Sequence, residues 1–134
     1  MYTSVLANCV VDGFKEVINQ SKAKIVYVCN LMSKKGQTVG MTANDHLKEV
    51  ATYIGKIPDV IIVNNTVFPD ELLNKYSEEG DFPVLNNCTG DSCTVYAESL
   101  VAMENIQLVS GDVLKRSLIR HDSDILASIL IKLV

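Results

Sequence analysis

The chain has 134 residues, of which 48% are hydrophobic and 21% are charged, and its formal net charge at neutral pH is -4. This composition is ordinary for a folded domain with a single core, and the lack of a dense Lys/Arg cluster argues against electrostatic binding of nucleic acid. No apolar run approaches the roughly 20 residues that cross a bilayer, and no basic stretch leads into an apolar segment as in a signal peptide. We therefore expect one α/β domain over residues 1–134, located in the cytoplasm, with no nucleic-acid partner and no membrane insertion.

A helix and a buried strand are the first predicted elements. The pattern predicts a helix over residues 3–20, in which Gly13 is an interruption, and a strand over residues 25–29. An uninterrupted apolar run such as residues 25–29 is typical of a strand buried on both faces of a parallel sheet. The apolar residues that recur at near-helical spacing in the first segment are Val5, Cys9, Phe14 and Val17.

A long polar loop then leads to the second predicted helix. The loop carries Gly36 and Gly40, and either Thr42 or Asn44 can cap the helix, which Gly55 ends. A strand, a long loop and a capped helix are how open α/β sheets form ligand crevices at the carboxyl ends of their strands. The apolar stripe expected along this helix consists of Leu47, Val50, Ala51 and Ile54.

Strands and helices continue to alternate in the second half of the chain. Such alternation predicts right-handed parallel crossovers and a sheet covered by helices, so we expect a Rossmann-like three-layer α/β fold with a mostly parallel sheet. Residues 95–103 fit a strand and a helix equally well. The other predicted elements are a strand over 59–65, a helix over 70–77 with Pro69 in its first turn, a short strand over 82–85, a loop over 86–93, a strand over 106–109 and a helix from about Ser123.

The four cysteines give no metal signature. Cys9 and Cys29 lie in apolar segments and are expected in the core. Cys88 and Cys93 match no common zinc spacing, and a disulfide between them is an open alternative to two free thiols. The two histidines are far apart in the sequence and no carboxylates occur at ligand spacing, so we predict no metal site.

Several short motifs follow one another along the chain: YTSVLAN at 2–8, IVYVCNLM at 25–32, GQT at 36–38, DH at 45–46, VIIVNN at 60–65 and RHD at 120–122. Together they resemble the superfamily of gluconeogenesis factor and 2-phospho-L-lactate transferase, termed CofD-like, and are closest to its gluconeogenesis-factor branch. Members of that family are more than twice as long. The resemblance therefore implies that this chain corresponds to the C-terminal half of a larger Rossmann-like fold.

The resemblance also implies a ligand, a nucleotide-linked small molecule. The gluconeogenesis-factor branch implies a regulatory, non-catalytic role in carbon metabolism and cell shape, with binding of a UDP-sugar such as UDP-N-acetylglucosamine. The transferase branch implies transfer of a phospholactyl unit from a nucleotide diphosphate donor, and only in that case is Mg²⁺ expected as a cofactor. Lys34, Lys35 and Gln37 depart from the family motif. The motif has a glutamate at the position of Gln37, and the loss of this carboxylate disfavours the transferase alternative.

A third alternative is a module that oligomerises or binds a partner and has no ligand of its own. Half of a sheet would expose strand edges and apolar faces, which favour pairing with another chain. On this ground we expect a homo-oligomer.

The candidate ligand-binding residues lie in the first loop and in the other motifs. Uncharged groups of the loop suit a sugar or a ribose, whereas Arg120 and His121 place positive charge beside a helix N-terminus, where a bound anion would be stabilised. Each of these residues also has a structural alternative: for Arg120 this is an ion pair with Asp112 or Asp122. The set comprises Thr3, Ser4, Asn30, Gln37, Thr38, Asn44, Asp45, His46, Asn64, Asn65, Arg120 and His121. No catalytic residue is assigned.

Overall fold

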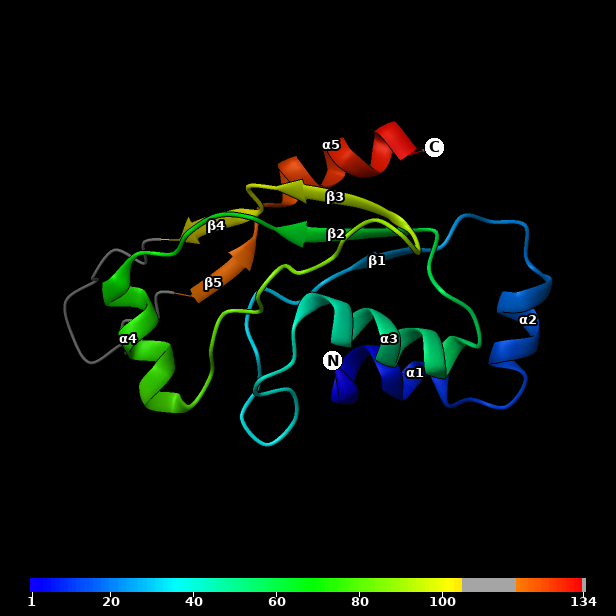
Figure 1. Cartoon of the computed structure of the whole chain (residues 1–134), viewed down its shortest axis with the longest axis horizontal. Helices are drawn as coiled ribbons and strands as arrows, with labels where there is room; N and C mark the ends of the chain where they lie inside the picture. Colours follow the sequence, from blue (N-terminus) through cyan, green and yellow to red (C-terminus); the bar gives the residue numbers. More distant parts are fainter. Residues whose placement is uncertain (105–117, 134) are drawn as a thin grey trace.

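A parallel sheet with helices on both faces forms the centre of the protein (Figure 1). The computed structural model describes residues 1–104 and 118–133. Within these residues the sheet has three strands in the order β1-β2-β3, which bears out the predicted α/β, Rossmann-like fold. The strands are β1 (Val26–Val28), β2 (Val60–Asn64) and β3 (Thr94–Glu98). The register places Val60 opposite Val26 on one side and opposite Thr94 on the other.

The N-terminal segment is broken, so the prediction of one helix over residues 3–20 is wrong. The segment forms a π-helical turn η1 (Tyr2–Leu6), a short α1 (Ala7–Cys9) and a separate α2 (Phe14–Gln20). Gly13 is the N-cap of α2 and has φ +80, a left-handed conformation that glycine adopts without a steric penalty. Because the chain turns there, Val17 is 67% exposed and does not continue the apolar stripe.

Helix α3 (Ala43–Ile54) forms as its sequence predicts. Thr42 is the N-cap: its hydroxyl accepts a hydrogen bond from the Asp45 backbone N–H, while the Asp45 carboxylate accepts one from the Thr42 N–H. Gly55 ends the helix in the left-handed conformation with φ +82. Its apolar stripe faces the sheet, and Leu47 and Ile54 are each 5% exposed.

The segment after β2 contains α4 (Asp70–Glu79), which Gly80 ends. Pro69 is the N-cap and stands just before the helix, not in its first turn as predicted. The predicted strand over residues 82–85 is also wrong, because only an isolated antiparallel bridge between Met32 and Pro83 forms there. A proline has no N–H to donate to a strand ladder, which limits pairing in so short a stretch.

A second, two-stranded sheet precedes the last helix. Antiparallel strands β4 (Val101–Glu104) and β5 (Leu118–His121) pair with Val101 opposite His121. Within the ambiguous stretch over residues 95–103, residues 95–98 belong to β3 and residues 101–103 belong to β4, so the strand alternative is correct and no helix forms there. Helix α5 (Ser123–Leu133) then begins at the predicted residue. The strand predicted over residues 106–109 lies outside the described residues.

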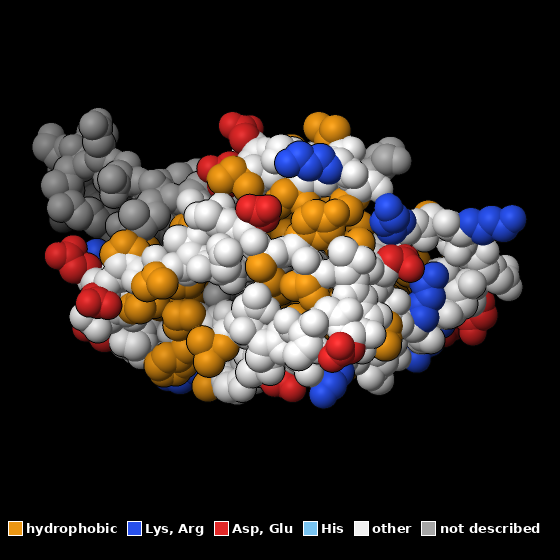
Figure 2. Space-filling model, turned by 45° about the horizontal axis from the view of Figure 1, so that its top comes forward, with side chains coloured by type: hydrophobic (Ala, Val, Ile, Leu, Met, Phe, Trp, Pro, Cys, Tyr) orange, Lys and Arg blue, Asp and Glu red, His pale blue; other side chains and the backbone are white. Residues whose placement is uncertain are grey.

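Two apolar clusters, one on each face of the sheet, give the three layers. On one face Val60 and Ile62 of β2 pack with Leu72 of α4 and Ile129 of α5. Figure 2 turns the α5 side forward and shows hydrophobic side chains between that helix and the strands below it. Successive residues of β2 belong alternately to the two clusters, as expected for a strand that is buried on both faces.

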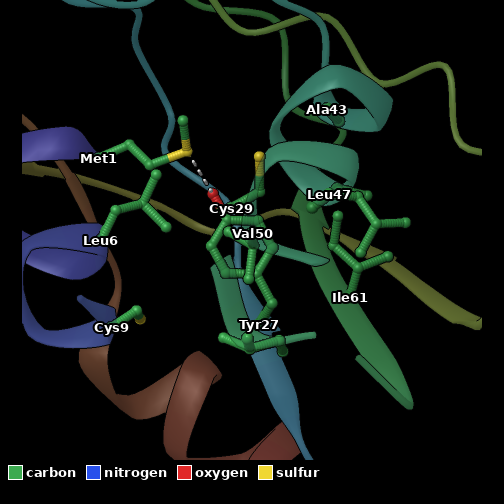
Figure 3. Close-up of a cluster of buried hydrophobic side chains, with 11 residues drawn as sticks. Met1, Leu6, Cys9, Tyr27, Cys29, Ala43, Leu47, Val50 and Ile61 are labelled. Atoms are coloured by element: carbon green, nitrogen blue, oxygen red, sulfur yellow. Dashed lines mark hydrogen bonds between the residues drawn. The ribbon is translucent and has the colours of Figure 1, made fainter. Parts of the chain in front are cut away.

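The opposite face packs against α1 and α3. Ile61 and Val63 of β2 lie in one cluster with Tyr27, Leu47 and Met1. Figure 3 shows Ile61, Tyr27, Leu47 and Met1 pointing toward one another from the strands and the helices. Cys9 and Cys29 are buried in this cluster, as predicted. All four cysteines are free thiols, so no disulfide joins Cys88 to Cys93. Among the described residues, no helix is long and apolar enough to cross a membrane.

Candidate functional site

Candidate residues from distant parts of the sequence meet at the carboxyl end of β1. His121 is the last residue of β5, and its ring Nε2 lies 3.1 Å from the carbonyl oxygen of Cys29. Asn30, which follows Cys29, begins the long loop and is half-buried. Arg120 precedes His121 on β5 and its side chain is exposed. The contact therefore places the strand that carries Arg120 at the edge of the sheet where the loop begins, as Figure 1 also shows.

The loop between β1 and α3 is held by a hydrogen bond within the loop and by contacts with Asp81, which lies outside it. The Thr38 side chain is fully buried, and its hydroxyl accepts a hydrogen bond of 2.8 Å from the Lys34 backbone N–H. Asp81 is 5% exposed; its carboxylate accepts a hydrogen bond from the Lys35 N–H and pairs with the Lys34 ammonium at 3.0 Å. Lys34 is thus engaged with the protein, and Gln37 is half-buried in the same loop.

These contacts shift the pKa values of both partners. Burial would raise the pKa of the Asp81 carboxyl, but its hydrogen bonds from Lys35 and Lys34 and their positive charges outweigh burial, so the pKa is lowered. The hydrogen bond to Asp81 raises the pKa of Lys34. Both groups are therefore charged at neutral pH. Lys34 and Asp81 form the one ion pair found among the described residues.

Of the candidates at the start of α3, Asp45 completes the capping box with Thr42, and His46 faces the core. Hydrogen bonds from Thr42 lower the pKa of the Asp45 carboxyl. The backbone N–H of Asn44 donates a hydrogen bond of 3.1 Å to the Asn87 side chain, and Asn44 itself is half-buried. These contacts give Asp45 a sufficient structural role and leave a ligand contact by Asn44 as a prediction.

His46 is fully buried and incompletely satisfied. Its Nδ1 lies 3.3 Å from the Tyr27 hydroxyl, and its Nε2 has no hydrogen-bond partner among the described residues. Burial lowers the pKa of the ring, and the N-terminal ammonium lowers it further. The imidazole is therefore neutral at physiological pH.

Asn64 and Asn65 brace the carboxyl ends of β2 and β3. The Asn64 side chain accepts a hydrogen bond from the Leu100 N–H at 3.1 Å and donates to the Thr66 carbonyl at 3.0 Å. The Asn65 side chain donates to the Ala97 carbonyl at 3.2 Å. Both amides are thus engaged with backbone groups near the site.

Thr3 and Ser4 lie elsewhere. They are exposed in η1, on the α3 side of the sheet and away from β5 (Figure 1). Of the twelve sequence candidates, the structure therefore gathers Asn30, Arg120 and His121 most closely at the carboxyl end of β1.

No preformed cluster of metal-ligating side chains is found among the described residues. Within the described part of the chain, no group of three or more His, Cys, Asp or Glu side chains is placed to hold a metal. The acids near the site already accept hydrogen bonds from the protein: Asp122 caps α5 by accepting from the Asp124 and Ile125 N–H groups at 3.0 Å. Among these same residues, Arg120 forms no ion pair with Asp122 or another acid.

Three residues that matter to the site were not among the candidates. Ser33 and Asp81 hold the loop, and Tyr76 contacts β5 through its hydroxyl. Asp81 directly follows the glycine that ends α4, a position that usually indicates only a turn. Nothing in its local sequence points to a loop that lies 46 positions away.

Comparisons of the sequence and of the structure with known proteins all point to the same family. The model of the family "2-phospho-L-lactate transferase CofD" matches residues 1–101. The gluconeogenesis factor of Bacillus subtilis is 34% identical over the full chain, and that of Halalkalibacterium halodurans is 43% identical over 63% of it. A crystal structure of a UPF0052-family protein from Bacillus halodurans superposes on 97% of the chain with a TM-score of 0.81 and 30% identity. The chain spans about 40% of the length of the Bacillus subtilis relative and 39% of that crystal structure.

Proposed function

The chain belongs to the CofD family, and we propose that its residues form one wall of a cytoplasmic site for a nucleotide-linked sugar of the UDP-sugar class. We further propose a regulatory role in carbon metabolism and cell shape, without catalysis by these residues. The relatives are named as gluconeogenesis factors. Since the chain spans about 40% of such a relative, the proposal concerns the part of the site that these residues supply.

The observation that carries the proposal is the contact between His121 and Cys29. It brings Arg120 to the carboxyl end of a parallel strand, which is where open α/β sheets bind their ligands. A guanidinium presents a fork of donors that matches phosphate oxygens, and Arg120 is exposed and unpaired with the described acids. A diphosphate beside Arg120 would therefore have a suitable partner.

The loop supplies groups of a different kind. Asn30, Gln37 and Asn44 carry uncharged side chains that both donate and accept hydrogen bonds, and all three are half-buried. Such groups suit the hydroxyls of a ribose or a sugar. A cationic side chain on one side and neutral polar side chains on the other match a molecule with a diphosphate between a nucleoside and a sugar.

Isothermal titration of this chain with UDP-N-acetylglucosamine tests the proposal, with the Bacillus subtilis relative titrated in parallel. We expect saturable binding with one site per chain. Binding by the longer relative together with no heat from this chain would contradict the claim that these residues bind by themselves. Titration with UDP and with free N-acetylglucosamine then separates the nucleotide from the sugar contribution.

The alternative within the family is a phospholactyl-type transferase, which its family name supports. Gln37 carries an amide where the family motif has a glutamate, and the described acids do not gather as metal ligands. We propose that turnover is absent. Release of nucleotide from a nucleotide diphosphate donor in the presence of magnesium would favour the transferase instead.

A second candidate function is self-association, which the edges of the sheet favour. Within the described residues, β1 and β3 each have a neighbour on one side only, so each leaves backbone groups open to pairing. Large apolar side chains are also exposed, including Ile131 of α5, which is 75% exposed. We propose a homo-oligomer. A monomeric mass by light scattering at micromolar concentration would contradict this.

A further inference from the structure

We propose that Tyr76 and Asp81, at the end of α4, are positioning residues that hold two walls of the site in a fixed relation to each other. One wall is the loop segment 33–38, and the other is β5, which carries Arg120 and His121. The effect on ligand binding rests on the proposed function, whereas the effect on the two walls can be measured without a ligand.

Asp81 fastens the loop wall. One carboxylate oxygen accepts a hydrogen bond of 2.6 Å from the Lys35 backbone N–H, and the other lies 3.0 Å from the Lys34 ammonium. A carboxylate that is 5% exposed is costly to bury unless such partners satisfy it, so this contact strongly favours one loop conformation. The contact continues to Ser33, whose hydroxyl accepts a hydrogen bond of 2.8 Å from the Phe82 N–H.

Tyr76 fastens the strand wall. Its hydroxyl accepts a hydrogen bond of 2.8 Å from the Ile119 backbone N–H, one residue before Arg120. Tyr76 and Asp81 are also joined directly, because the Asp81 N–H donates to the Tyr76 carbonyl at 3.0 Å. A single turn of backbone therefore connects the anchor of the loop to the anchor of β5.

The turn itself leaves little room for change. Gly80 has φ +82, and a Cβ at this position would lie 3.0 Å from Cδ of Lys35. The aliphatic part of Lys35 thus covers the turn directly, while Lys34 is held by Asp81. Lys34 already pairs with Asp81, whereas Arg120 forms no ion pair among the described residues, so Arg120 is better placed than Lys34 to bind a phosphate.

Tyr76 and Asp81 should therefore affect the geometry of the site more than the stability of the fold. Neither Tyr76 nor Asp81 belongs to the sheet, and Tyr76 is only half-buried. Loss of either side-chain contact should leave the two apolar clusters intact and release one wall relative to the other. A ligand that contacts both walls would then bind more weakly.

The test uses the full 134-residue chain with the substitutions Y76F and D81A. D81N is the conservative variant, because its amide oxygen can still accept from the Lys35 N–H. Two matched controls are Y53F, in a half-buried tyrosine of α3, and D12N, in an exposed aspartate. Amide hydrogen exchange by NMR is measured at Lys35 and Ile119, and binding is measured by titration with UDP-N-acetylglucosamine.

We expect D81A to speed exchange at Lys35 and Y76F to speed exchange at Ile119, each by about 3- to 10-fold, the size of one ordinary hydrogen bond. D81N should restore most of the protection at Lys35, and the controls should leave both amides unchanged. Y76F and D81A should each weaken binding by a similar factor at an unchanged far-UV circular dichroism spectrum.

The outcomes separate the two proposals. Unchanged exchange at Lys35 in D81A and at Ile119 in Y76F overturns the positioning role, whether or not the ligand binds. Wild-type affinity in both variants also overturns it. Faster exchange as expected, in a chain to which UDP-N-acetylglucosamine does not bind, supports the positioning role and counts against the proposed ligand. If D81A does not fold, Y76F and D81N still decide the question.

Discussion

The ring of His121 donates its Nε2 hydrogen bond to the carbonyl oxygen of Cys29 over 3.1 Å, across 92 positions of sequence. The contact joins the two-stranded sheet to the carboxyl end of the parallel sheet. Open α/β proteins bind ligands in a crevice at the carboxyl ends of their parallel strands, and this contact identifies residues that lie at that crevice here.

Removal of this contact should loosen the site more than the fold. For H121A we expect a loss of about 1 kcal/mol in the free energy of unfolding, the usual net value of one hydrogen bond. We also expect weaker binding of UDP-N-acetylglucosamine, because Arg120 is no longer held at the end of β1. Urea denaturation and titration calorimetry check the two effects. H121Q can still donate to the Cys29 carbonyl, and equal losses in H121A and H121Q would show that the contact has no role.

Arg120 should supply most of the charge that binds the ligand. R120A should weaken binding by roughly 10- to 100-fold, the effect of losing a hydrogen bond to a charged group, about 1.5–3 kcal/mol. R120K should lie between the wild type and R120A, because an ammonium replaces the charge without the fork of donors.

The matched control is K22A, which removes the same charge from an exposed residue in the turn before β1, at the other end of the sheet. Calorimetry of the three variants should show near wild-type affinity for K22A. Equal weakening in R120A and K22A would indicate a general effect of net charge and no contact with Arg120.

The capping box of α3 should contribute measurably to stability. T42A removes the hydroxyl that accepts from the Asp45 N–H, and the usual cost of losing such a cap is about 1 kcal/mol. T52A, in the exposed part of the same helix, is the matched control, since its hydroxyl bonds only to the Lys48 carbonyl one turn earlier. Chemical denaturation of the two variants should therefore differ, and identical midpoints would argue against a stabilising cap.

Buried His46 should make the protein less stable in mild acid. Burial holds the folded pKa of the ring below its ordinary value of 6.5, so the unfolded chain takes up a proton first as the pH falls. Stability should fall as the pH drops from 6.5 toward the lowered folded value, by at most about 1.4 kcal/mol per pH unit. The lowered pKa values of Asp45 and Asp81 act only below their ordinary value of 3.8, outside this window.

Denaturation at pH 7.5 and pH 5.5 measures this effect in the wild type and in H46Q. The variant has no titrating ring at this position and should lose less stability between the two pH values. An equal loss of stability in both proteins would show that a group other than His46 causes the pH dependence.

The parts of the fold that the sequence predicts well are those with local causes. Helix α3 has its cap, its apolar stripe and its terminal glycine within one short stretch, and β2 is an apolar run bounded by turn residues. The break at Gly13 was visible as an interruption, but apolar spacing alone could not show that the chain turns there. Strand β5 has only four residues, and its strand conformation depends on pairing with β4.

The candidate site shows the same limit. Sequence motifs indicated Arg120, His121 and Asn30, but their proximity depends on how β5 meets β1. Asp81 and Tyr76 have no local sign of their role, because each acts on a segment about 40 positions or more away. Such residues become visible only when the tertiary contacts are known.

The proposed site is tested most directly by mapping where UDP-N-acetylglucosamine binds on this chain. A titration followed by amide chemical shifts in two-dimensional NMR answers this, since each backbone N–H reports its own surroundings. We predict saturable shifts at Asn30, Gln37, Arg120 and His121, and none in the groove between α1, α2 and α3 that is lined by Val10, Glu16 and Tyr53. Shifts confined to that groove, or no shifts at millimolar ligand, would contradict it.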